Sequence, residues 1–143
     1  MTTTITPTAQ SLAGVFRRAA QVITLNGLAK GAFVAPPAIP DARRELHCCD
    51  ERRRPVDMVG AIRIACGHLP TLPEGLLDEG IVRSAIEFAS LRVPGQAPWT
   101  DGAPDHIEHL ADWTDLTAVD AADVAVKFLD LAVVASAESR VAS

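Results

Sequence analysis

The segment Asp105-His106-Ile107-Glu108-His109 brings two imidazoles and two carboxylates together within a short stretch of chain. His106 and His109 are three residues apart, so a helix would place them on one face. Such a pair could ligate a divalent metal with the nearby carboxylates, or act as a general acid and base. We favour the alternative of a solvated polar face with Ile107, Leu110 and Ala111 turned inward, because a His-x-x-His pair alone is a weak signal. Since the His-Glu-x-x-His pattern of zinc proteases is absent, we predict no metal site and retain both histidines as acid–base candidates.

Two carboxylates elsewhere in the chain complete this candidate set. Asp57 stands where a second helix is expected to begin, and Asp favours that position because its carboxylate accepts backbone N–H groups that lack a partner. Asp115 follows Trp113 and Thr114. The candidate catalytic residues are therefore Asp57, His106, His109 and Asp115.

Arginines form the densest charge of the chain, at positions 43, 44, 52, 53 and 54. Guanidinium groups bind phosphate or carboxylate through paired hydrogen bonds, and the N-terminus of the following helix could add backbone donors. Against this, the Asp57 carboxylate would already occupy that terminus. The alternative is a solvated loop that contacts the acidic residues 101–130. We name Arg52, Arg53 and Arg54 as candidates for binding an anion.

The tryptophans are Trp99 and Trp113, and each is followed by Thr and Asp. A tryptophan is usually buried with its indole N–H bonded, so we expect Trp113 in the core. Trp99 lies in a Pro-rich loop and could line a pocket or an interface. Both are candidates for contacting a ligand.

The cysteines are Cys48, Cys49 and Cys66, an odd number with two adjacent, which indicates no disulfide framework. Together with His47 and His68 they could supply zinc ligands, but their spacing fits no standard zinc pattern. Cys66 lies on the expected apolar face of a helix, where a cysteine behaves as a small hydrophobic residue. We predict a reducing, cytoplasmic location and no cofactor.

Charge is divided unevenly along the 143 residues. Residues 1–70 hold nine Lys and Arg against five Asp and Glu, a net of +4, whereas residues 71–143 hold four against thirteen, a net of −9. The second half has no basic cluster and aromatic residues are only 4%, so we expect no nucleic-acid partner. The first residues do not resemble a secretory signal, and no apolar run approaches the roughly 18 residues of a membrane span.

Hydrophobic periodicity and end signals predict five helices, over residues 7–26, 57–66, 74–91, 104–113 and 120–136. In the last one, Val124, Phe128, Leu131 and Ala135 form the buried stripe, which Leu129 and Val133 broaden. Residues 41–54 are an expected Arg-rich loop and residues 93–103 a Pro/Gly-rich loop. At most a minor β-hairpin is expected, around 30–35 and 54–58. The sequence thus predicts one mainly α domain over 1–143, a compact bundle of about five helices.

Three segments resemble an uncharacterised family of small proteins common in actinobacteria and their phages, defined as a domain of unknown function. The segments are Lys30-Gly31-Ala32-Phe33, residues 54–63, and Trp113-Thr114-Asp115 followed by residues 120–124. The likeness covers about two-thirds of the chain. Asp57 stands at the place of the family's usual cysteine, and Thr114 at the place of its usual Asn. The resemblance implies the outline of a helical fold and no mechanism.

These observations predict a small binding or interaction protein that acts without a cofactor, on a protein partner or a small molecule, with a homo-oligomer as one option. The competing prediction is a small metabolic or biosynthetic enzyme that uses acid–base residues in an apolar pocket. A deep apolar cavity with two candidate groups inside would favour the enzyme. A shallow surface with a large exposed apolar patch would favour the interaction protein.

Overall fold

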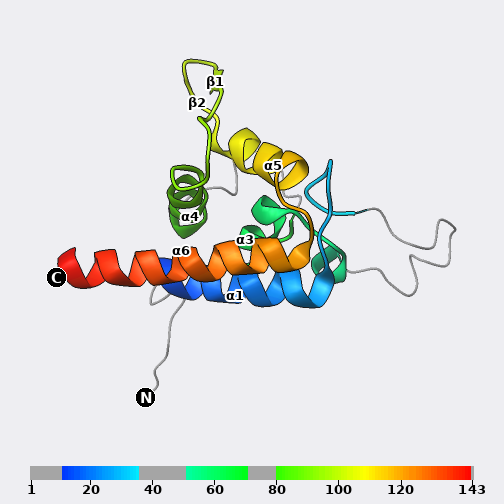
Figure 1. The fold of residues 1–143 in the computed structure, drawn as a ribbon, viewed down its shortest axis with the longest axis horizontal. Helices are drawn as coiled ribbons and strands as arrows, with labels where there is room; N and C mark the ends of the chain where they lie inside the picture. Colours follow the sequence, from blue (N-terminus) through cyan, green and yellow to red (C-terminus); the bar gives the residue numbers. More distant parts are fainter. Residues whose placement is uncertain (1–10, 36–50, 71–79, 143) are drawn as a thin grey trace, which may run out of the picture.

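The computed structural model describes residues 11–35, 51–70 and 80–142, and within them the fold is mainly α (Figure 1). The five α-helices of the described residues are α1 Leu12–Asn26, α3 Met58–Ala65, α4 Gly80–Ser90, α5 His106–Leu116 and α6 Ala121–Ala142. A short 3-10 helix, η2, spans Glu51–Arg53. The prediction of a compact, mainly α fold with about five helices is confirmed. No helix in the described ranges has the length and apolar character needed to cross a bilayer.

Helices α1 and α6 lie side by side and antiparallel, and they form the base on which the other helices rest (Figure 1). Phe16 of α1 is fully buried at this contact, with its ring centroid 6.2 Å from that of Phe128 and 5.6 Å from that of Phe88. The remaining core residues are mostly Ala, Val and Ile from α1, α3 and α4. Burial of this apolar surface is the main force that holds the helices together.

Several helix ends differ from the sequence prediction. Helix α1 begins at Leu12, where Ser11 caps it by accepting a hydrogen bond of 3.0 Å from the Gly14 N–H. The predicted residues 7–10 lie outside the described residues. Helix α5 begins at His106 rather than at Pro104, since Pro104 belongs to a strand and Asp105 is the cap. Helix α6 continues to Ala142, beyond the predicted end at residue 136. The first part of the helix predicted over 74–91 lies outside the described residues.

The two-stranded hairpin of the described residues lies in the loop that was expected to be irregular. Strand β1 (Trp99–Thr100) pairs antiparallel with β2 (Ala103–Pro104). Around 30–35 and 54–58, the region where a minor hairpin was expected, Val56 instead makes two isolated bridges, one to Leu28 and one to Val34. The segment before α3 is therefore held between two parts of the loop that follows α1.

The outer face of α6 differs from the prediction of which residues are buried. Leu129 and Val133 were expected to broaden the buried stripe, but they are exposed, as is Val126. The buried stripe of Val124, Phe128, Leu131 and Ala135 is confirmed. Helix α6 therefore carries apolar residues on two opposite faces, one packed in the core and one exposed.

Candidate functional site

Asp57 is the N-cap of α3 and lies almost completely inside the protein, with 1% of its surface exposed. Its Oδ1 accepts a hydrogen bond of 2.8 Å from the Gly60 N–H. Gly60 is needed here because a Cβ at this position would lie 2.4 Å from the Phe33 carbonyl oxygen. The loop of residues 31–34 therefore lies directly against the first turn of α3.

Asp115, in the last turn of α5, holds the same loop from the other side. Its Oδ1 accepts a hydrogen bond of 2.8 Å from the Gly31 N–H. Gly31 has a φ of 81°, a left-handed conformation that favours glycine. The Lys30 ammonium donates to the Ala118 carbonyl oxygen beyond the end of α5. Residues 30–34 are thus fixed between α3 and α5.

Asp57 and Asp115 consequently line one cleft, which we call the Asp57 cleft. Its volume is about 440 Å³, and its other lining residues are the loop 31–34 with Glu108 and Ala111 of α5. Phe33, Val34 and Ala111 supply apolar surface beside the carboxyl groups. Two of the four predicted catalytic residues are brought together here.

Burial raises the pKa of Asp57 from 3.8 to about 7. The Gly60 N–H opposes this rise by stabilising the carboxylate, the negative charge of Asp115 adds to it, and Arg63 acts against it. The pKa of Glu108 at the rim is also raised, first because its carboxyl shares a hydrogen bond with Asp112 and then by the charge of Asp112. Asp57 can therefore gain or lose a proton near neutral pH, beside a second carboxyl group.

The two histidines of α5 lie away from this cleft and share one serine. Ser90 Oγ, at the end of α4, is 2.8 Å from His106 Nδ1 and 2.8 Å from His109 Nδ1. His109 is buried, and its Nε2 lies 2.9 Å from the Pro94 carbonyl oxygen. The interpretation of these histidines as a solvated face is wrong for His109, because α4 and the loop after it cover that ring.

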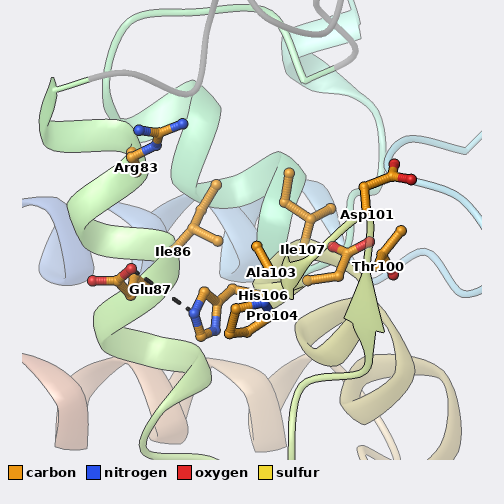
Figure 2. Close-up of a pocket in the computed structure, with 10 residues that line it drawn as sticks. Arg83, Ile86, Glu87, Thr100, Asp101, Ala103, Pro104, His106 and Ile107 are labelled. Atoms are coloured by element: carbon orange, nitrogen blue, oxygen red, sulfur yellow. Dashed lines mark ion pairs between the residues drawn. The ribbon is translucent and has the colours of Figure 1, made fainter.

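His106 lines a second cleft, of about 610 Å³, which we call the His106 cleft (Figure 2). Its walls are α4, the β1–β2 hairpin and the start of α5. His106 Nε2 is 3.8 Å from Glu87 Oε2, and Figure 2 shows the Glu87 side chain turned toward the imidazole. Arg83 lies one helical turn before Glu87 on the same wall.

The family is decided by a match over most of the chain: residues 7–133 match the model of a family of unknown function, DUF6197. This chain belongs to the DUF6197 family. No curated protein and no solved structure matches it. Three segments of this DUF6197 chain that are far apart in the sequence contribute to the Asp57 cleft or to the residues beside it. They are residues 30–33, 54–63 and 113–115.

The remaining candidate residues of the DUF6197 chain line neither cleft. The backbone carbonyls of Arg52 and Arg54 accept hydrogen bonds from Asn26, and the Arg54 guanidinium donates to the Ala35 carbonyl at 3.4 Å. Residues 43–50 lie outside the described residues, so the predicted approach of the arginine loop to the acidic stretch stays a prediction. Trp113 is partly buried against the core, whereas Trp99 is 72% exposed.

Cys66 is partly buried beside α3, and burial raises the pKa of its thiol to about 11. A thiol with this pKa is a poor nucleophile, because the thiolate is the reactive form. His47, Cys48 and Cys49 lie outside the described residues. Across the parts of the chain that are described, no three His, Cys, Asp or Glu side chains are grouped closely enough to hold a metal ion.

Sequence reasoning missed Ser90, Glu87 and Arg83. Ser90 meets the histidines only across 16 and 19 residues of chain, and nothing in its local sequence indicates this contact. The only indication that the loop 31–34 forms part of a site was that residues 30–33 resemble a segment of the family. Gly60, whose missing side chain admits that loop, gave no signal within a Gly-Ala-rich helix start.

Proposed function

We propose that this protein binds a small organic cation, such as a protonated amine, in the Asp57 cleft. The single observation that carries the proposal is the position of Asp57, a side chain 1% exposed that lines an open cleft together with Asp115. A buried carboxylate is costly unless a positive charge or hydrogen bonds compensate it. The Gly60 N–H and the charge of Arg63 compensate Asp57 only in part, because its pKa remains raised to about 7. An ammonium group in the cleft would compensate both carboxylates.

The surroundings suit the hydrocarbon part of such a ligand. Phe33, Val34 and Ala111 face the same space of about 440 Å³, which is the lower size range of small-molecule sites. A bound cation lowers the pKa of a neighbouring carboxyl. Binding near neutral pH would therefore release a proton from Asp57.

The first test compares amines with neutral molecules of the same shape. Butylamine, cyclohexylamine and benzylamine would each be titrated into the ¹⁵N-labelled protein, beside the corresponding alcohols, and the amide signals of Gly31, Ala32 and Gly60 followed by NMR. The proposal predicts saturable shifts with at least one amine and none with its alcohol. Equal responses to amine and alcohol would contradict it.

Two conservative variants make this test specific. Asp115→Asn keeps an oxygen for the Gly31 N–H and Asp57→Asn keeps a favourable helix cap, so both should fold while losing the charge. Each is expected to weaken amine binding by about tenfold or more, a loss of ~1.4 kcal/mol. Asp130→Asn, an exposed residue of α6 outside the cleft, is the matched control. Unchanged affinity in both cleft variants would contradict the proposal.

The same arrangement also supports the enzyme alternative in one respect. Two predicted acid–base groups converge in the Asp57 cleft, and a carboxyl with a pKa of about 7 could serve as acid or base near neutral pH. Chemical conversion of a bound amine, followed by NMR over hours, would favour catalysis over binding alone.

A second candidate function is interaction with a protein partner. The observation in its favour is the exposed face of α6, where Val126, Leu129 and Val133 follow one another at helical spacing, with Val133 69% exposed. A second copy of the chain is the simplest partner. Sedimentation of the wild type and of Val133→Lys over a range of concentrations would test it: self-association lost in the variant supports the interface, and a wild type monomeric throughout contradicts it.

A further inference from the structure

The hydrogen bonds around Ser90 determine which nitrogen of each histidine carries a proton. The Pro94 carbonyl can only accept, so His109 Nε2 must donate to it. In neutral His109 the Nδ1 is then an acceptor, and Ser90 donates its one hydroxyl proton to that atom. Ser90 Oγ is left as an acceptor for His106 Nδ1, which must carry a proton.

The consequence is that neutral His106 directs an unprotonated Nε2 toward the His106 cleft, near Glu87 (Figure 2). Protonation at this nitrogen keeps the bond to Ser90 and adds a donor that faces Glu87. Protonation of His109 Nδ1 would instead place two donors, this N–H and the Ser90 O–H, against each other, and the hydrogen bond between them would be lost. His106 Nε2 is therefore the nitrogen of this network that can accept a hydrogen bond or a proton from a ligand.

Charged groups of both signs line the same cleft as this nitrogen. Helix α4 contributes Arg83 and Glu87, the hairpin contributes Asp101, and Asp105 lies at the start of α5. The Asp105 carboxylate is already engaged as the α5 cap, through a bond of 3.0 Å from the Glu108 N–H. Arg83 and Glu87 are four residues apart on one helix, so their Cβ atoms are neighbours about 6 Å apart. Figure 2 shows Glu87 directed toward His106 and the Arg83 guanidinium apart from both.

We propose that the His106 cleft is a second binding site, which takes a small zwitterion with an ammonium group at one end and a carboxylate at the other. The ammonium group donates to His106 Nε2 and pairs with Glu87, and the carboxylate pairs with Arg83. Ile86 and Ile107 line the wall between these groups and contact the hydrocarbon part. This site is separate from the Asp57 cleft and does not depend on the function proposed for it.

The test uses γ-aminobutyrate as the zwitterion, with butyrate and butylamine as probes that each carry one of its two charges. NMR of the imidazole nitrogens reports directly on His106. The proposal predicts a saturable shift of the His106 Nε2 signal with γ-aminobutyrate at millimolar concentration, and binding about tenfold weaker or absent with the other two probes. A shift of the His106 Nε2 signal that saturates with butyrate or butylamine at the same concentration as with γ-aminobutyrate would overturn the proposal, as would no shift of this signal with any probe.

Variants distinguish this site from a general charge effect. His106→Asn retains a side-chain N–H that can reach Ser90 but has no counterpart of Nε2, and Arg83→Gln removes the positive end. Both should lose the response to γ-aminobutyrate, measured at the amide of Glu87, with the folded spectrum retained. Arg17→Gln, an exposed arginine of α1 outside this cleft, is the matched control. If Arg83→Gln and His106→Asn still bind like wild type, the assignment is wrong.

Discussion

Asp115 Oδ1 and the backbone N–H of Gly31 are joined by a hydrogen bond of 2.8 Å across 84 residues of chain. This bond attaches the end of α5 to the loop that lies on the first turn of α3. Because Asp57 begins α3, the same loop brings Asp57 and Asp115 to one cleft. The proposed cation site depends on this relationship.

The pH dependence of stability should reveal the buried Asp57 carboxyl. Its folded-state pKa of about 7 lies above the ordinary value of 3.8, so the folded protein holds more protons than the unfolded chain between these values. The stabilisation that the protonated Asp57 carboxyl gives to the folded state is therefore fully present below about pH 3.8, and it is lost as the pH rises through about 7. The loss is at most about 4 kcal/mol. Urea unfolding at about pH 5 and about pH 8 measures the larger part of this loss, because at about pH 5 the unfolded chain is already deprotonated at this group.

Asp57→Asn supplies the comparison for that experiment, because an amide resembles the protonated acid at every pH. The stability of the wild type relative to this variant should fall between the two pH values. Asp130→Asn should show no such change relative to the wild type. A difference between wild type and Asp57→Asn that is constant with pH would contradict the buried, titrating carboxyl.

Gly60→Ala should displace the loop that forms one wall of the Asp57 cleft. Its Cβ would lie 2.4 Å from the Phe33 carbonyl oxygen, which is backbone and cannot rotate away. Overpacking of this kind costs about 1–3 kcal/mol. Thermal unfolding measures the cost, and the Gly31 amide signal should move. Gly14→Ala, whose nearest neighbour is the Ser11 hydroxyl at 3.2 Å, is the control and should unfold near the wild-type temperature.

Ser90→Ala should lower the free energy of unfolding, because two histidines share the hydroxyl of this serine. The change leaves the buried His109 Nδ1 without its donor, a loss of about 1–3 kcal/mol. Denaturant unfolding tests this against Ser84→Ala, an exposed serine on the same helix. Long-range ¹H–¹⁵N correlation spectra of the wild type should also show the proton on Nε2 of His109 and on Nδ1 of His106. The opposite protonation would refute the network.

Cys66 should react slowly with alkylating reagents. Burial raises the pKa of its thiol to about 11, so at about pH 8 its thiolate fraction is roughly a hundredfold below that of a free cysteine. Iodoacetamide labelling followed by peptide mass spectrometry resolves this residue from the other cysteines. Labelling of Cys66 at the rate of free cysteine in the folded protein would show that the thiol is not buried as described.

Local signals predicted the helices well, and the structure shows where they stop being sufficient. Asp57 was recognised as a cap from its type and place, and the bond to Gly60 confirms it. Helix α6 was predicted with too broad a buried face, because Leu129 and Val133 are apolar but have no neighbouring element to cover them in the described residues. Periodicity identifies apolar positions, and only the packing decides which of them are covered.

The candidate sites depended more strongly on contacts that cross the chain. The sequence selected Asp57 and Asp115 separately, but nothing local placed them in one cleft. Their meeting depends on Gly31 and Gly60, whose roles come from a left-handed turn and a close backbone approach. Likewise, the spacing of His106 and His109 predicted a shared helix face, but not the serine from α4 that links them.

The most direct test of the proposed cation site is a ¹³C NMR titration of the Asp57 carboxyl with and without saturating benzylamine. Without ligand, the midpoint should lie at about pH 7. With benzylamine bound, we expect a midpoint well below this value, because the ammonium charge stabilises the carboxylate. With benzyl alcohol we expect no change. A midpoint that stays at the same pH with saturating amine would contradict the binding of a cation in the Asp57 cleft.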